Sequence, residues 1–371
     1  MTIIALPDES LLDIFDLYRR AVIFLPESVS WWTTLAHVCR RWQAIILASP
    51  QRLHLRVTCD PRTPVKTSLD IWPPFPIAII CLPSHTVDEK RGENITAALE
   101  HRDRISDLNI FDEAGISLKR WVVAMQEPFP AITDLYLGTL PQESPVVLPD
   151  AFLGGYAPRL RRFTLQGVSF PALPRFVLHA THIVLLSLSG IPNSWYTSVS
   201  PEAMATCLAA LPDLETLRIK FRSSPSSPLQ MPLPPRIHSV LPALTSFAFT
   251  GVSKYLEGVI ARIDAPHLNE LRIMFFMNLI FDIPQLHRFI GRTGRLRPLN
   301  PAQIQFRGYE IKITLGSSTR FELEIICKEP DRRLPSVTQV CNEHFLSEVE
   351  RLDVRDTSLT KLLWRNEVDT S

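Results

Sequence analysis

A short apolar pattern recurs along most of the 371-residue chain and restricts its fold more than any other feature. Each occurrence has the form apolar-x-x-apolar-x-apolar, so its last two apolar residues alternate with other residues as in a half-buried strand. The first residues of the occurrences are Ile105, Ile132, Leu160, Ile183, Leu214, Leu244 and Leu268, and the pattern returns at Val349. The first seven are separated by 27, 28, 23, 31, 30 and 24 residues. Units of this length must stack on their neighbours to bury an apolar face.

A proline precedes the predicted strand in several of these units. Five of them read FPAITDL, APRLRRF, LPDLETL, LPALTSF and APHLNEL, and in each the proline ends a preceding helix about two residues before the strand. Residues Asn94–Arg102 and Pro201–Leu211 are two such predicted helices. The period is typical of a leucine-rich-repeat solenoid, which predicts an α/β domain of right-handed βα repeats with parallel strands over residues 94–371. An α/β domain whose strands are leucine-rich by coincidence remains the alternative.

The regularity breaks between Asp282 and Cys341. Residues Ile283–Arg292 have a helical pattern, and Tyr309–Leu315 and Phe321–Ile325 alternate on either side of a Gly-Ser-Ser turn. This predicts a late β-hairpin that covers or extends the solenoid, or binds a partner. A solenoid also needs a polar terminal cap. None is visible after the last repeat, so we expect the repeat domain to be truncated at its C-terminus.

Residues 57–93 are predicted to be a proline-rich connector. Their prolines argue against any regular helix, while Ile77–Cys81 is a candidate buried strand. Just before the connector, Leu53–Val57 alternates like a strand that leaves the N-terminal region.

Residues 1–56 form a predicted unit of two amphipathic helices. Asp8 is a candidate N-cap of the first helix and Ser30 of the second, and Ser49-Pro50 ends the second. The first helix has its apolar stripe at Leu11, Ile14, Phe15 and Tyr18, and the second at Trp31, Leu35, Val38, Trp42 and Ile45. So small a unit is marginal alone and gains stability by docking on something else. An ordinary helical hairpin folded onto the rest of the chain would explain the same pattern.

Two separated blocks of this unit, Leu6-Pro7-x-Glu9 with Leu12 and Ile14-Phe15, and later Val38-Cys39-Arg40-Arg41-Trp42, resemble the F-box. The segment between them, Arg19–Ser30, is longer than in a compact F-box, and it is apolar. This longer form is similar to the F-box proteins of mushroom-forming fungi. F-box proteins are substrate receptors of SCF-type ubiquitin ligases, in which the F-box binds Skp1 and Skp1 bridges to a cullin–RING ligase. The resemblance implies Skp1 contacts by Leu6, Pro7, Glu9, Leu12, Ile14, Phe15, Val38, Cys39 and Trp42.

The resemblance implies a non-enzymatic adaptor whose repeat domain binds a target protein, as yet unknown, on its concave sheet. The residues between the inward leucines are then the substrate-binding candidates: Tyr136, Arg162, Gln166, Arg218, Lys220, Glu270 and Arg272. Further residues of that face are Asp134, Thr164, Thr216, Arg351, Asp353 and Arg355, and their mixed charge argues against a purely acidic ligand. Two alternatives stay open, a leucine-rich-repeat scaffold without ligase engagement and a hydrolase or transferase with an unrecognised site.

Composition and the absence of known motifs argue against several other classes of protein. The net charge of +1 provides no global field for nucleic acid or an anionic membrane. We interpret the local cluster of Arg288, Arg292, Arg295 and Arg297 as a solvated helix face. The six cysteines form no CxxC pair, and no GxxxxGK[ST], GxGxxG, GxSxG or HExxH motif occurs, so we expect no metal and no cofactor. With no signal peptide and no apolar run of eighteen residues, an intracellular protein of the cytoplasm or nucleus is expected.

Overall fold

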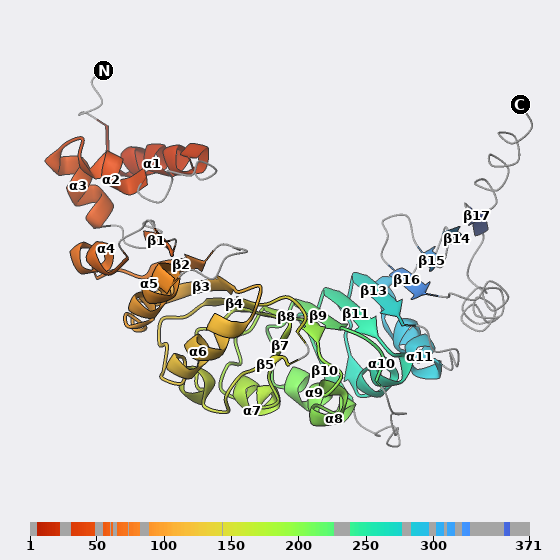
Figure 1. The fold of residues 1–371 in the computed structure, drawn as a ribbon. Helices are drawn as coiled ribbons and strands as arrows, with labels where there is room; N and C mark the ends of the chain where they lie inside the picture. Colours follow the sequence, from red (N-terminus) through yellow and green to blue (C-terminus); the bar gives the residue numbers. More distant parts are fainter. Residues whose placement is uncertain are drawn as a thin grey trace, which may run out of the picture. The chain divides into compact units, whose positions relative to one another are not determined.

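The computed structural model describes residues 6–22, 31–48, 55–59, 61, 65–72, 74–81, 89–142, 144–225, 238–276, 283–296, 302–307, 310–315, 321–326 and 352–356. The chain divides into two compact units. Unit 1 comprises Met1–Thr139 and Ala151–Leu160, and unit 2 comprises Leu140–Asp150 and Arg161–Ser371. Both are α/β structures with a mostly parallel sheet (Figure 1).

Unit 1 begins with three helices, α1 (Asp8–Val22), α2 (Trp31–Ala36) and α3 (Arg40–Leu47). Four parallel strands follow in the order of the chain, and a helix lies between each strand and the next. These elements are β1 (Leu55–Thr58), α4 (Val65–Ile71), β2 (Ile77–Cys81), α5 (Glu89–Leu99), β3 (Ile105–Phe111), α6 (Ile116–Ala124) and β4 (Asp134–Gly138), with the 3-10 helix η4 (Phe152–Gly155) after them. The predicted βα alternation is therefore present, and it begins earlier in the chain than the sequence pattern did.

In unit 2 the strand order is β6-β8-β9-β11-β13-β16-β15-β14-β17. The first six of these strands are parallel to their neighbours, and β16, β15 and β14 are antiparallel. The main elements are β6 (Arg162–Gln166), α7 (Leu173–Val177), β8 (Leu185–Ile191), α8 (Trp195–Ser198), α9 (Pro201–Ala209), β9 (Thr216–Phe221), β11 (Ser246–Gly251), α10 (Ser253–Ile260), β13 (Glu270–Phe275), α11 (Pro284–Arg292), β14 (Ala302–Arg307), β15 (Glu310–Leu315), β16 (Phe321–Ile326) and β17 (Leu352–Asp356). Short additions are β5 (Val146–Val147), β7 (Val168–Ser169), β10 (Ser239–Val240), β12 (Ile263–Asp264) and η5 (Gly294–Leu296).

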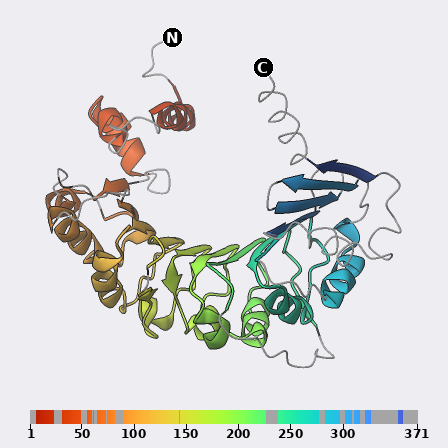
Figure 2. The same ribbon diagram turned by 45° about the vertical axis from the view of Figure 1, so that its right-hand side comes forward.

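The core of unit 2 consists of rows of apolar side chains that run across the parallel strands. One row joins Phe163, Leu186, Leu217, Phe247, Leu271 and Phe321, all fully buried. A second row, two residues along each strand, joins Leu165, Leu188, Ile219, Phe249, Ile273 and Leu323, and is equally buried. The helices that Figure 1 labels α7 to α11 lie on one side of this sheet, as the turned view of Figure 2 shows. Because side chains alternate along a strand, the residues between these rows face the side without those helices.

The late hairpin is confirmed and extends the sheet. β15 and β16 pair antiparallel, and β16 adds in parallel to β13 with Phe321 opposite Leu271. The predicted helix at Ile283–Arg292 is α11, while the turn residues 316–318 and Tyr309 lie outside the described residues.

Two predictions about helices were wrong. The second N-terminal helix is two helices, because Cys39 is extended (φ −162°, ψ 166°) and separates α2 from α3. The turn was not predicted, because the helical spacing of apolar residues continues across it. The proline-rich connector does contain a helix, α4, because Pro64 and Pro73 leave the residues between them free to form one. The last repeat does form a strand, β17, in which Leu352 and Val354 are 47% and 57% exposed. Several residues used in the sequence predictions lie outside the described residues. They are the predicted N-cap Ser30, the predicted helix end at Ser49-Pro50, Leu53 at the start of the strand before the connector, and Val349 at the start of the last repeat.

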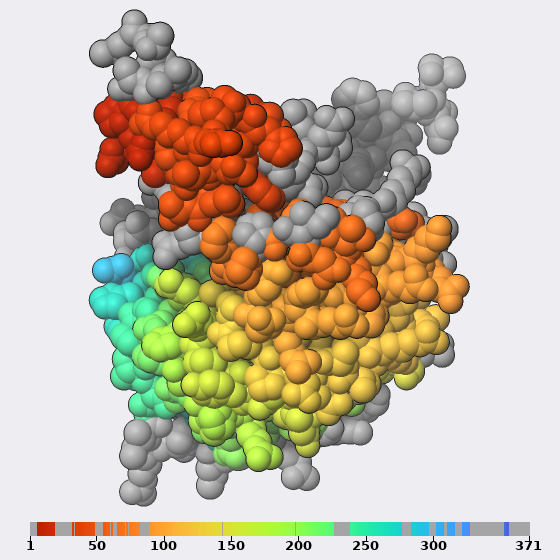
Figure 3. Space-filling view, turned by 90° about the vertical axis from the view of Figure 1, so that its left-hand side faces the viewer, coloured from red at the N-terminus to blue at the C-terminus, as the bar shows by residue number. Residues whose placement is uncertain are grey.

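The helices α1, α2 and α3 pack against one another and form one continuous body in the space-filling view of Figure 3. The predicted N-cap Asp8 is instead the first residue of α1. The carbonyl of Pro7 accepts the first helical hydrogen bond, from the Leu11 amide. This leaves the Asp8 carboxylate available for a contact with another helix.

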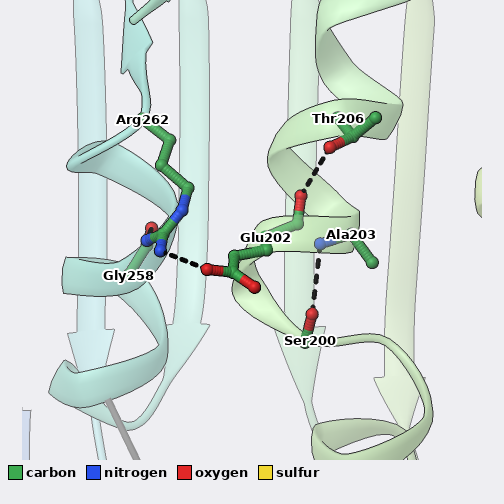
Figure 4. Close-up of polar contacts among 6 residues, drawn as sticks. All are labelled: Ser200, Glu202, Ala203, Thr206, Gly258 and Arg262. Carbon is green, nitrogen blue, oxygen red and sulfur yellow. Dashed lines mark hydrogen bonds and ion pairs between the residues drawn. The ribbon is translucent and has the colours of Figure 1, made fainter. Parts of the chain in front are cut away.

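A buried arginine joins two helices of unit 2 (Figure 4). Arg262 donates to the Gly258 carbonyl and to the Glu202 carboxylate, each at 2.7 Å. Glu202 lies in the first turn of α9, whose N-cap Ser200 accepts from the Ala203 amide at 3.1 Å. The guanidinium is 9% exposed, so its hydrogen bonds replace the water that it loses. This contact fixes the spacing of α9 and α10 behind the sheet.

A second buried charge, Glu257, should contribute strongly to stability. Its carboxylate accepts from the Gln285 and Leu286 amides of α11, both at 2.8 Å, and the residue is 3% exposed. We predict that Glu257→Ala lowers the free energy of unfolding by about 3 kcal/mol, because two amides at the start of α11 lose a charged acceptor. Glu257→Gln keeps one acceptor oxygen and should cost less. Urea denaturation measures both, and equal losses for the two variants would contradict this role.

Candidate functional site

The two sequence blocks of the N-terminal unit meet through Arg41. Its guanidinium Nη2 lies 2.6 Å from the Leu6 carbonyl oxygen and 2.6 Å from Oδ1 of Asp8. Arg41 belongs to α3, while Leu6 lies just before α1 and Asp8 is its first residue, so one side chain joins the first block to the second. Sequence reasoning did not assign this role, because the pairing spans 33 residues and depends on the turn between α2 and α3.

A second contact between the blocks is aromatic. The rings of Phe15 and Trp42 meet edge to face, with centroids 4.9 Å apart and planes at 61°. Phe15 is 2% exposed and Trp42 is half-buried. Together with Leu11, Ile45 and Ile46, which are also buried, these rings form the core of the helical unit.

The predicted Skp1-contact residues therefore divide by exposure. Phe15 is buried, and Leu6, Leu12 and Trp42 are half-buried. The exposed residues of the set are Pro7, Glu9, Ile14, Val38 and Cys39.

The apolar residues of α1 cover more of its circumference than its core contacts use. At about 100° per residue, positions 11, 12, 14, 15, 17 and 18 span an arc of about 220°. Leu11 and Phe15 are buried, Tyr18 and Ile14 are 36% and 38% exposed, and Leu17 at the end of the arc is 63% exposed. We call Ile14, Leu17, Tyr18 and Val38, which is 57% exposed, the exposed apolar set. Leu17 was missed from the sequence, although its spacing of three from Ile14 signals the same helix face.

The predicted substrate-binding residues lie on the strands as expected. Tyr136 of unit 1 is half-buried, and its burial raises the pKa of its hydroxyl. In unit 2, Arg162, Arg218, Lys220 and Arg272 are exposed, while Gln166 and Glu270 are half-buried. All six alternate with the buried rows and therefore share the face of the sheet opposite the helices.

Some charges on this face are paired with each other. Glu270 accepts from the Ser246 hydroxyl at 2.9 Å and forms an ion pair with Arg272 at 2.5 Å. Arg355 pairs with Asp353 on β17 at 2.8 Å, and Arg351 lies outside the described residues.

The hairpin contributes a triad that sequence reasoning missed. Lys312 of β15 lies 2.6 Å from Glu322 and 3.3 Å from Glu324 of β16. Burial lowers the pKa of Lys312, but hydrogen bonds and the charges of the two glutamates outweigh burial, so its pKa is raised. The alternation of charges in the hairpin was the available signal, but only the strand register shows which ones pair.

Unit 1 also contains an open groove between α5 and α6 with a volume of 970 Å³. Its lining includes Glu89 and Glu93 of α5, Glu100 just after that helix, and Arg120 and Trp121 of α6, and it contains no histidine or cysteine. Nothing in this lining resembles a catalytic constellation.

The structure also describes the surroundings of several cysteines and of part of the arginine cluster. Among the described cysteines, Cys59, Cys81 and Cys207 are buried, and Cys39 is exposed. Within the described ranges, no group of three or more histidine, cysteine or acidic side chains could hold a metal ion. In the arginine cluster, Arg288 is exposed and Arg292 pairs with Asp264 at 2.9 Å; Arg297, Cys327 and Cys341 lie outside the described residues. No helix in the described part of the chain has the length and apolar character needed to cross a bilayer.

Comparison with known proteins gives no relative. No protein-family model, no curated protein and no solved structure matches this chain.

The division between core and surface in the helical unit can be tested by mutation. We predict that Phe15→Ala lowers the free energy of unfolding of this unit by about 3–5 kcal/mol, because it leaves a cavity beneath Trp42. Ile14→Ala, on the exposed apolar set, should cost less than about 1 kcal/mol. Hydrogen exchange of the α1–α3 amides in the full chain measures both. A large loss in Ile14→Ala together with a small loss in Phe15→Ala would reverse the assignment.

Proposed function

We propose that the chain is the substrate-recognition adaptor of an SCF-type (Skp1–cullin–F-box) ubiquitin ligase. In this proposal residues 1–56 are an F-box that docks on a Skp1-like protein. The α/β repeats are a leucine-rich-repeat-like domain that holds a target protein. The proposed partners are intracellular, which would place the chain in the cytoplasm or nucleus.

The observation that carries the proposal is the contact between the two sequence blocks that resemble the F-box. Arg41 binds the backbone of Leu6 and the carboxylate of Asp8, and Trp42 packs on Phe15. The blocks are separated by the segment Arg19–Ser30, so their meeting was not dictated by sequence proximity. A helical unit built on both blocks is what the F-box resemblance requires.

The exposed apolar set supports the same proposal. Several exposed apolar side chains on one small unit are unfavourable in water and are typical of a protein-binding site. Ile14, Leu17 and Tyr18 follow one another at i, i+3 and i+4 on α1, which presents a ridge of side chains to a partner. Val38 lies in the turn between α2 and α3 and is 57% exposed.

In this role the chain supplies no reacting group. Its contribution to ubiquitin transfer is proximity, because it raises the effective concentration of target lysines near the E2 thioester.

Co-purification with a Skp1-like protein tests the proposal. We predict that the wild-type chain, co-expressed with a tagged Skp1 homologue, co-elutes with it. Val38→Asp should weaken binding by at least about tenfold, because it places a charge in an apolar interface. Thermal unfolding of the variant should match that of the wild type, since Val38 is exposed.

The matched control is Val123→Asp on α6, where the valine is 61% exposed and lies outside the helical unit. It makes the same chemical change and should leave co-elution intact. A well-folded wild-type chain that does not co-elute would refute the adaptor and favour a repeat scaffold without ligase engagement.

A further inference from the structure

In the sequence of unit 2, basic and acidic residues are interspersed, but the strand register places most of them on different strands. Neighbouring residues on the face opposite the helices form rows across the sheet. One row reads Thr164, Ser187, Arg218, Ala248, Arg272 and Glu322, and the next reads Gln166, Ser189, Lys220, Thr250, Met274 and Glu324. In these two rows the basic residues lie on β9 and β13, and the acidic residues lie on β16.

Strands β6, β8, β9 and β11 form the basic part. Their charged residues on this face are Arg162, Arg218 and Lys220, and none of the face positions on these four strands is acidic. The remaining face positions are Thr164, Gln166, Leu185, Ser187, Ser189, Thr216, Ser246, Ala248 and Thr250. We call the face of these four strands the basic–hydroxyl surface.

Two of its cations have no charge partner. Among the described residues, neither Arg218 nor Lys220 forms a hydrogen bond or an ion pair, and both are exposed. Arg218 is flanked by Ser187 and Ala248, whose short side chains carry no charge. Ser189 and Thr250 flank Lys220 in the same way. Because the side chains next to them are short and uncharged, both cations are accessible to a ligand.

The carboxylates of this face are too distant or already engaged. Glu322 lies three strands from Arg218, about 14 Å at the usual strand spacing, which exceeds the screening length of about 8 Å at physiological salt. It is also paired with Lys312. Glu270 is engaged by Arg272 and by the Ser246 hydroxyl. Glu215, which precedes β9, is about 10 Å along the strand from Arg218.

We infer that the basic–hydroxyl surface binds an extended, carboxylate-rich segment of a partner protein. Arg218 and Lys220 are two residues apart on β9, a distance of about 7 Å along a strand. An extended peptide with acidic residues at i and i+2 presents carboxylates at the same spacing, and the flanking hydroxyls donate further hydrogen bonds to them. The mixed charge of the whole face does not oppose this ligand, because the acidic part lies on other strands.

The same geometry disfavours other anions. A single phosphate group needs donors that converge on one point, whereas these two cations are spread along the strand. Single-stranded nucleic acid needs aromatic platforms for its bases, and the described face positions of these four strands include no aromatic residue. Identifying the partner as a ubiquitylation target rests on the proposed function, but the binding chemistry does not.

The test uses the full chain and a fluorescein-labelled peptide of alternating glutamate and serine, twelve residues long. Fluorescence anisotropy should show binding that weakens from 50 to 300 mM NaCl, and the peptide with glutamine in place of glutamate should not bind. The double variant Arg218→Gln/Lys220→Gln should bind about five- to thirtyfold more weakly, since it removes two exposed ion pairs that contribute about 0.5–1 kcal/mol each.

The matched control is Lys254→Gln/Arg288→Gln, which removes the same charge from exposed residues of α10 and α11 on the helical side. It should bind the peptide within twofold of the wild type. Equal weakening in both double variants would overturn the inference, as would tighter binding of a twelve-nucleotide single-stranded DNA that competes for the surface. Co-elution with the Skp1-like protein should be unchanged in both, so failure of peptide binding and failure of the adaptor proposal are separate results.

Discussion

The shared register of the parallel strands in unit 2 is the constraint on which the rest of that unit depends. Six strands align so that Phe163, Leu186, Leu217, Phe247, Leu271 and Phe321 form one buried row. Each such side chain contributes about 1.5–3 kcal/mol when fully buried, and a slip of one residue would turn a whole row to the opposite face. The register therefore fixes the core and, by alternation, the arrangement of side chains on the other face. Arg262 and Glu257 hold the helices behind the core through buried polar contacts.

The sequence predicted the strands well because their signal is local. An apolar residue at every second position needs no partner to be recognised, and each of the seven regular repeats contains a buried strand. The hairpin and α11 were predictable for the same reason. The break at Cys39 was not, because the apolar spacing continues across the turn and no glycine or proline marks it. Helix α4 was missed because the prolines at its borders were taken to exclude a helix between them.

The candidate surfaces were only partly predictable. The residues on the face opposite the helices followed from alternation, but the gathering of Arg218 and Lys220 away from Glu322 and Glu324 depends on which strands are neighbours. In the helical unit, the resemblance named nine contact residues without distinguishing surface from core. The structure places Phe15 in the core and exposes Leu17, because α1 has more apolar residues than α2 and α3 can cover. That surplus is the physical reason to expect a partner at this unit.

The most direct test of the adaptor proposal is to locate the surface that a Skp1-like protein covers. Hydrogen exchange of the full chain, measured alone and in complex with that protein, resolves this at the level of short segments. The account predicts slower exchange in α1 and around residues 37–39, with exchange of β8, β9 and β11 unchanged. A stable complex in which protection falls on the sheet of unit 2, and α1 exchanges as in the free chain, would contradict it.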